Sequence, residues 1–144
     1  MALDLNDKTS NGNNLTNVNT ATEVTTALPF AQSTSAVNFA VASSQHLSAA
    51  DSVSLSITGN LTIECWAKFT STPTSGNNYT HVGKGTNTLD KRSYFFFLFN
   101  NAGTLSLRFF YSTDGTFQAG NDVNVAWTPT TETWYHLAVT YNTT

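Results

Sequence analysis

Residues 94–111, YFFFLFNNAGTLSLRFFY, contain two apolar runs joined by Asn100–Gly103. Asparagine favours turns and glycine takes positive φ at little cost, so the stretch predicts a β-hairpin. A turn of four residues would pair Phe99 with Thr104 and fix which side chains share a face. The expected core face carries Tyr94, Phe96, Leu98, Leu105, Leu107 and Phe109. The opposite face carries Phe95, Phe97, Phe99, Thr104, Ser106, Arg108 and Phe110.

Two further stretches predict strong strands. Residues 61–69, LTIECWAKF, alternate with the period of two that is typical of a half-buried strand. Residues 133–141, TWYHLAVTY, alternate in the same way. In the first stretch, the apolar face carries Leu61, Ile63, Cys65, Ala67 and Phe69, and the other face carries Thr62, Glu64, Trp66 and Lys68.

Weaker strands are predicted at residues 2–5, 14–18, 36–41, 79–82 and 123–127. Turn-forming residues separate these segments, and no segment has the spacing of an amphipathic helix. Many short strands at this spacing predict an all-β fold of two antiparallel sheets packed face to face, a β-sandwich or jelly roll.

The amino-acid composition limits the classes of partner that the chain can bind. The 144 residues are 40% hydrophobic, enough for one domain over residues 1–144 with a sizeable core. Only 6 residues are Lys or Arg and the net charge is -3, so we expect no nucleic-acid partner. No apolar segment approaches the roughly 20 residues that span a bilayer, and no signal peptide is visible, so membrane insertion is not expected. Cys65 is expected to be a small buried hydrophobe.

The chain lacks the patterns of hydrolytic enzymes. Glycoside hydrolysis uses a pair of carboxylates across the scissile bond. The glutamates Glu23, Glu64 and Glu132 have no carboxylate two residues away, and the three histidines form no metal-binding or nucleophile motif. We therefore expect no catalysis. His136, with no partner carboxylate evident in the sequence, is expected to be a hydrogen-bonded structural residue.

Aromatic side chains on the outward faces are the candidate binding residues. Sugars place C–H faces against aromatic rings while their hydroxyls meet charged and amide groups. A row of outward phenylalanines is also apolar enough to be covered by loops or to form a protein interface, and this alternative stays open. The candidate binding residues are Glu64, Trp66, Lys68, Phe95, Phe97, Phe99, Arg108 and Tyr111.

The loop from Asp7 to Asn14 is a candidate calcium site. Asp7, Asn11 and Asn13 offer the hard oxygen ligands that Ca²⁺ prefers, next to the flexible Gly12. Asparagine and glycine are also common in ordinary turns that bind no metal, so a turn without a metal is the second interpretation.

Four stretches, in this order, resemble segments of one known family: DKTSNGNNLT (7–16), the run 36–69, YTHVGKG (79–85) and ETWYHLAVTYN (132–142). The chain thereby resembles the concanavalin A-like lectin/glucanase superfamily, in particular its laminin-G-like jelly-roll modules, nearly from end to end. Hydrolases of this fold carry Glu-x-Asp-x-x-Glu on one strand, which has no counterpart here. The resemblance thus implies a non-catalytic carbohydrate-binding or adhesion module, with a structural calcium at the Asp7 loop.

The resemblance also bears on completeness, partners and location. Related modules continue past the Trp-Tyr-His strand, so we expect this domain to be incomplete at its C-terminus. We expect a fragment of a longer protein rather than a domain that a strand from another chain completes. The expected partner is a glycan or surface polysaccharide. A structural virion or appendage subunit that packs against its own copies or a scaffold is the alternative, favoured by the uncharged Thr-, Ser- and Asn-rich composition. Either function places the protein on a virion or extracellular surface.

Overall fold

The computed structural model describes residues 3–86, 91–116, 118 and 120–143. The chain forms two compact units, Met1–Ser56 and Ile57–Thr144, which are described separately below. Among the described residues, no helix is both long enough and apolar enough to span a membrane.

The first unit consists of short strands. β1 (Thr16–Val18) pairs with β4 (His46–Ser48), and β2 (Thr22–Val24) pairs with β3 (Ala36–Asn38), both antiparallel. Two 3-10 turns, Val41–Ser43 and Val53–Leu55, follow β3 and β4.

Several strand predictions in this unit need correction. The strand predicted at 36–41 stops at Asn38, because the chain turns into the 3-10 segment that ends with Ser44 in the left-handed region. The strand predicted at 2–5 is wrong over its described residues 3–5, where a single bond from the Leu15 N–H to the Leu5 carbonyl replaces a ladder. β2 and β4 were not predicted, since three residues are too few to show alternation.

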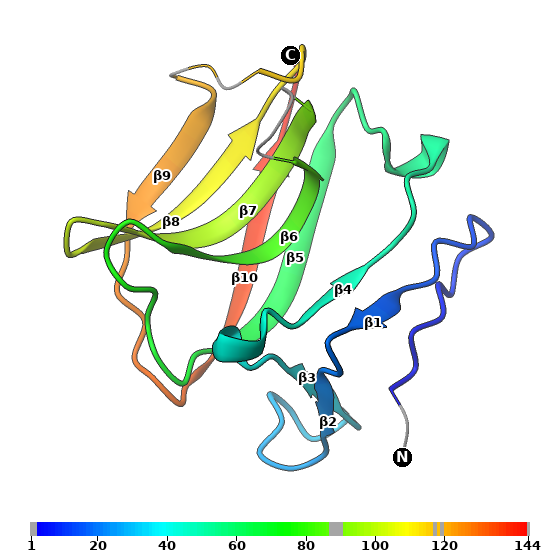
Figure 1. The fold of residues 1–144 in the computed structure, drawn as a ribbon, viewed down its shortest axis with the longest axis vertical. Helices are drawn as coiled ribbons and strands as arrows, with labels where there is room; N and C mark the ends of the chain where they lie inside the picture. The colour runs from blue at the N-terminus through cyan, green and yellow to red at the C-terminus, as the bar shows by residue number, and fades with distance from the viewer. Residues whose placement is uncertain (1–2, 87–90, 117, 119, 144) are drawn as a thin grey trace. The chain divides into compact units, whose positions relative to one another are not determined.

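The second unit is an antiparallel sandwich (Figure 1). One sheet has the order β6-β7-β8-β9, and the other pairs β5 with β10. The strand bounds are β5 Leu61–Lys68, β6 Asn78–Thr86, β7 Lys91–Asn101, β8 Thr104–Tyr111, β9 Asp122–Ala126 and β10 Trp134–Tyr141. The predicted all-β antiparallel fold is confirmed, and the strong strands at 61–69 and 133–141 lie where they were predicted.

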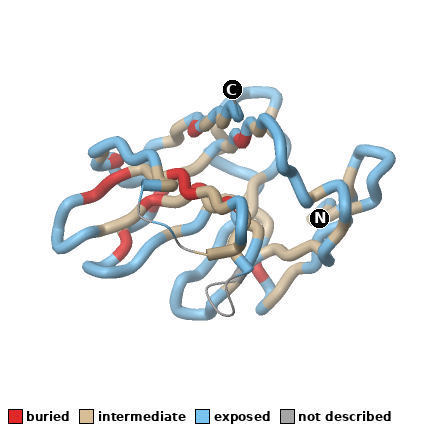
Figure 2. The backbone as a smooth tube through the Cα atoms, turned by 90° about the horizontal axis from the view of Figure 1, so that it is seen from above, coloured by how far each residue is buried: buried red, intermediate tan, exposed pale blue. Residues whose placement is uncertain are grey.

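The core lies between the two sheets of this unit. Its buried members are Ile63, Phe69, Tyr94, Phe96, Leu98, Leu105, Phe109 and Leu137. Buried positions fall mostly within strands, and the connecting loops are largely exposed (Figure 2). The core face predicted for the hairpin is confirmed, because its side chains are buried or pack against this cluster.

The hairpin register differs from the prediction. The turn has two residues, Ala102 and Gly103, with φ of 50° and 95°, and Asn101 pairs with Thr104. Two successive positive φ values match the right-handed twist of the flanking strands, which favours the two-residue turn over a four-residue one. The Asn100 side chain accepts the Gly103 N–H at 2.8 Å and closes the turn. Because the register moved by two residues, every side chain kept its predicted face.

Candidate functional site

The structure divides the predicted binding residues between two faces. Ile63 and Leu137 of the β5–β10 sheet share a core with Phe96 of the other sheet. Side chains of opposite parity therefore point away from each other, on the two outer sides of the sandwich. Glu64, Trp66 and Lys68 lie on one outer side, and Phe95, Phe97, Phe99 and Arg108 lie on the other. The sequence reasoning had treated them as one surface.

The outer side of the β5–β10 sheet carries an exposed indole. We call this surface the tryptophan face, and it consists of Thr62, Glu64, Trp66, Lys68, Trp134, His136, Ala138 and Thr140. Trp66 is 45% exposed and lies opposite His136 in the register. Their ring centroids are 5.2 Å apart with an interplanar angle of 30°, so the imidazole supports one side of the indole.

Charged pairs border this indole. The Glu64 carboxylate lies 3.3 Å from His136 Nε2, diagonally across the two strands. Lys68 Nζ lies 3.4 Å from the Glu132 carboxylate and 5.7 Å from the Trp134 ring centroid. Exposed pairs of this kind contribute little to stability, but they hold donors and acceptors beside the ring.

The sequence reasoning missed part of this face. It did not assign Trp134, His136 or Glu132 to a binding surface. The usable signal was the alternation of residues 133–141, which places Trp134 and His136 on one side of a strand. The pairing of β10 with β5 could not be known, so Glu64 was not recognised as the partner of His136.

The outer side of the four-stranded sheet is packed with aromatic rings. We call it the phenylalanine face: Phe95, Phe97, Phe99, Ser106, Arg108 and Phe110. Arg108 lies 4.6 Å above the Phe99 ring, donates from Nε to Ser106 at 3.0 Å, and places Nη1 3.7 Å from the Asp122 carboxylate.

Rings on this face pack against backbone as well as against each other. The Phe95 ring lies over Gly83, where an added Cβ would come within 2.6 Å of Phe95 Cδ1. Phe95, Phe97 and Phe99 are half-buried, and Phe110 is buried. A ligand on this face would therefore meet rings whose area is already partly covered by neighbouring side chains and backbone.

Tyr111 belongs to neither outer face. It lies opposite Tyr94 in the register and packs against the core cluster. Its ring centroid is 4.3 Å from that of Tyr141, so it joins the two sheets from within.

The Asp7 loop is held by its own carboxylate. The Asp7 carboxylate accepts the N–H groups of Thr9 and Asn13 at 2.8 Å each, and these bonds lower the pKa of Asp7. The Asn11 N–H reaches the Thr9 hydroxyl at 3.2 Å, and Ser52 donates to the Asn13 side chain at 2.7 Å. These hydrogen bonds hold the loop in a compact turn. Each Asp7 oxygen accepts one N–H and keeps acceptor capacity, and calcium binding at this loop stays a prediction.

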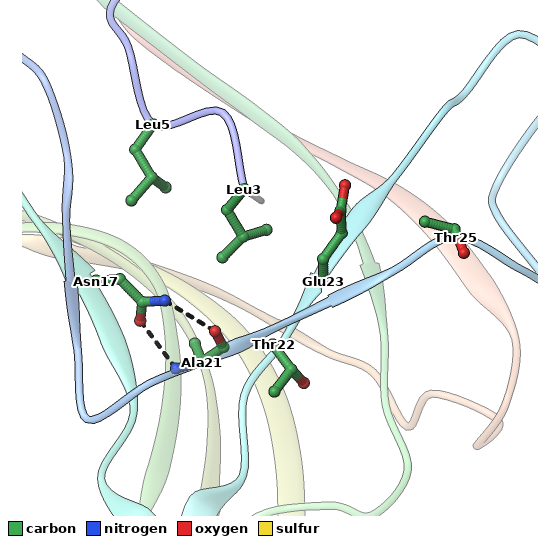
Figure 3. Close-up of a pocket in the computed structure, with 7 residues that line it drawn as sticks. All are labelled: Leu3, Leu5, Asn17, Ala21, Thr22, Glu23 and Thr25. Atoms are coloured by element: carbon green, nitrogen blue, oxygen red, sulfur yellow. Dashed lines mark hydrogen bonds between the residues drawn. The ribbon is translucent and has the colours of Figure 1, made fainter. Parts of the chain in front are cut away.

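The first unit contains a hollow of about 590 Å³ (Figure 3). The Asn17 amide brackets Ala21 there: its Nδ2 donates to the Ala21 carbonyl and its Oδ1 accepts the Ala21 N–H, both at 2.8 Å. These bonds fix the turn between β1 and β2. The lining residues are Leu3, Leu5, Asn17, Ala21, Thr22, Glu23 and Thr25.

A comparison with known protein families shows which family this chain is related to. A laminin G family model, described as "Concanavalin A-like lectin/glucanases superfamily", matches residues 41–144. The chain belongs to this superfamily. The match confirms the predicted family and agrees with the observed β-sandwich. Searches of curated proteins and of solved structures find no match to this concanavalin A-like chain.

Membership supports a lectin-like or adhesion-type module in general terms. The superfamily description names both lectins and glucanases, so membership does not by itself decide whether this concanavalin A-like chain is an enzyme. The match begins at residue 41, so the likeness of the Asp7 loop to the opening loop of such modules stays a prediction.

Proposed function

We propose that this chain is a non-catalytic carbohydrate-binding or adhesion module whose glycan site is the tryptophan face. The observation that carries the proposal is the 45% exposed indole of Trp66, supported by the His136 ring at 5.2 Å. An aromatic ring held against a second ring offers a flat, preorganised surface for the C–H side of a sugar.

Polar groups around this indole suit sugar hydroxyls. The carboxylate of Glu64 is an acceptor, and Lys68 is a donor on the same strand. The Thr62 and Thr140 hydroxyls lie 3.3 Å apart and can each donate or accept. A surface polysaccharide, which repeats its hydroxyl pattern, fits such a row of adaptable groups.

A glycan array probed with the multimerised protein tests the proposal. The Trp66→Ala variant should lose the selective binding of the wild type, whereas Phe97→Ala, a ring-to-alanine change on the opposite outer side, should keep it. Circular dichroism shows whether each variant is folded. Loss of binding only in Phe97→Ala would move the site to the phenylalanine face. A folded wild type that binds no glycan would refute the proposal.

The non-catalytic part of the proposal has its own test. The carboxylate of Glu64 is paired with His136 at 3.3 Å, whereas glycoside hydrolysis pairs two carboxyl groups. We expect no reducing sugar to be released from β-glucans. Release that disappears in Glu64→Gln would establish an enzyme.

The Asp7 loop would hold calcium through Asp7, Asn11 and Asn13. A bound ion would supply positive charge that fixes the loop. The sugar site proposed above uses none of these residues.

A role in assembly is the second candidate. Its supporting observation is the phenylalanine face, whose half-buried rings and Arg108–Asp122 pair resemble a protein contact more than an open sugar groove. In this role the chain would pack against its own copies or a scaffold, as a decoration or fibre subunit of a virion or appendage. Sedimentation of the wild type and Phe97→Ser distinguishes the two, because only an assembly surface makes the sedimentation coefficient depend on Phe97.

A further inference from the structure

The chain contains one Asn-Gly pair, Asn11–Gly12, which lies in the Asp7 loop of the first unit. Both residues are exposed, and Gly12 has a φ of 69°. A Cβ built on Gly12 would meet no atom within 4 Å, so the space beside its backbone is open. Glycine also has no side chain of its own that could crowd its backbone nitrogen. The Gly12 backbone is therefore open to attack chemistry that a larger residue would hinder.

The side chain of Asn11 is free, unlike those of the two asparagines that follow Gly12. It makes no hydrogen bond among the described residues. The Asn13 side-chain carbonyl accepts the Ser52 hydroxyl at 2.7 Å, and the Asn14 side-chain carbonyl accepts an N–H of the loop at 2.8 Å. A side chain held in this way cannot turn onto the next peptide nitrogen, whereas that of Asn11 can.

An asparagine amide that can reach the next peptide nitrogen undergoes a known reaction. The Gly12 nitrogen attacks the side-chain carbon Cγ of Asn11 and closes a succinimide ring. The bond from Cγ to Nδ2 breaks, and the amide group leaves as ammonia with the proton that the Gly12 nitrogen gives up. Water then adds to either ring carbonyl and opens the ring to aspartate or to isoaspartate. Because the attack is intramolecular, water is the only other reagent.

We propose that Asn11 is a site of spontaneous deamidation and that its isoaspartate product loosens the Asp7 loop. The Asp7 carboxylate holds this loop by accepting the N–H groups of Thr9 and Asn13, which lie on either side of Asn11 in the sequence. In isoaspartate the main chain runs through the former side chain, which inserts a methylene between these two donors. Both donors then lose the geometry that they need to bond one carboxylate. The new carboxylate also repels that of Asp7.

The change should reach the segment that packs on the loop. Asn13 joins the loop to the 3-10 turn Val53–Leu55, because its side chain contacts the hydroxyls of Ser52 and Ser54 at 2.7 and 2.9 Å. A displaced Asn13 would break these contacts and free the loop from the turn. None of these residues belongs to the tryptophan face, so the proposal does not depend on carbohydrate binding.

Ageing of the purified chain tests the first step. The protein is incubated in mildly alkaline buffer with EDTA, so that no bound cation engages Asn11. Chymotrypsin then releases residues 6–15, NDKTSNGNNL, by cleavage after two leucines. Tandem mass spectrometry should show conversion of amide to acid at Asn11 at least about tenfold faster than at Asn13 or Asn14. Isoaspartyl methyltransferase should label the product.

Matched variants separate the effect of the glycine from that of the free side chain. Gly12→Ala should slow the conversion at least about tenfold, because the added methyl group hinders the attack. Asn14→Gly creates a second Asn-Gly pair in the same loop, whose asparagine, Asn13, is held by Ser52. In this variant Asn11 should convert at least about threefold faster than Asn13. Circular dichroism shows whether each variant is folded.

Amide exchange tests the second step. Anion exchange separates the aged protein from the unaged protein by its additional negative charge. The amides of Thr9 and Asn13 should exchange faster in the isoaspartate form than in the unaged protein. Asn11→Asp adds the same charge without the extra methylene and should keep the slower exchange of these amides.

The adverse results overturn one step each. Conversion at Asn11 that is no faster than at Asn13 in the wild type would overturn the assigned site. Equal rates at the two Asn-Gly pairs of Asn14→Gly would show that the free side chain does not select Asn11. Exchange in the isoaspartate form that matches the unaged protein would overturn the loosening of the loop, and equal loosening in Asn11→Asp would overturn the role of the inserted methylene.

Discussion

His81 provides the sharpest test of the core. It is one extra residue in β6 at the register shift between Thr80 and Val82, and its ring lies 5.6 Å from the ring centroids of both Phe69 and Phe96. Nε2 is buried and has no hydrogen-bond partner among the described residues. The perturbation is His81→Leu, which keeps a side chain of similar size and removes the polar atom.

The size of the expected stability change follows from the pKa of His81. Burial between the two rings lowers the pKa of His81 from 6.5 to about 4, because the charged imidazolium loses its hydration. Between these values the unfolded chain binds the proton and the folded chain does not. The contribution of neutral His81 to the free energy of unfolding is therefore fully present above pH 6.5. It is lost as the pH is lowered toward the folded pKa, by about 3 kcal/mol in total. That is a large part of the stability of an ordinary domain.

Urea unfolding from pH 7.5 to pH 4 measures this loss. All three tryptophans, Trp66, Trp127 and Trp134, lie in the second unit, so their fluorescence reports the unit that contains His81. The free energy of unfolding of His81→Leu should exceed that of the wild type by about 1–3 kcal/mol at pH 7, from removal of an unsatisfied polar atom. The excess should grow by about 3 kcal/mol toward pH 4.

The control and the refuting result are equally direct. His46→Leu makes the same change at an exposed position of the first unit and should leave the pH dependence of tryptophan fluorescence unaltered. A constant difference between the wild type and His81→Leu across this pH range would refute the reasoning, because it would mean that His81 pays no charge-burial cost.

Three further predictions concern the turns and loops. Ala102→Asn should raise the free energy of unfolding in urea by about 0.5–1 kcal/mol, because asparagine adopts the observed φ of 50° more readily than alanine. Gly85→Ala should lower it by more than about 1 kcal/mol, since a Cβ at φ of 124° would lie 2.3 Å from the Lys91 carbonyl, while Gly59→Ala meets no atom within 4 Å and should change little. Calcium should raise the thermal midpoint of the wild type but not of Asp7→Asn, and identical melting curves in calcium and in EDTA would contradict a calcium site.

The sequence predicted the faces of the long strands better than it predicted their partners. Alternation alone identified the buried side of residues 61–69 and of the hairpin, because burial imposes a period of two on any half-buried strand. The hairpin turn was misjudged, since Asn100 and Asn101 favour turns by composition but continue β7 here. Pairings such as β5 with β10 join residues about 70 positions apart, and no local pattern records them.

The candidate site shows the same limit. The sequence predicted correctly that Trp66 and Phe97 point outward, but not that they point outward on opposite sides. That fact depends on which sheet each strand joins. Likewise, Tyr111 was predicted to be a binding residue, whereas its register position opposite Tyr94 places it toward the core.

Exposed apolar side chains occur in two different settings within the second unit. Trp66 is exposed on an outward face, beside a carboxylate and an imidazole that water can also reach. Sugar hydroxyls can replace the water molecules that hydrate these polar groups. Val123 and Val125 are exposed on an inward face and have no polar group to offer, so covering them gains free energy mainly from the apolar area removed from water. Ligand binding beside Trp66 should therefore vary with sugar stereochemistry, whereas the two valines offer apolar area alone.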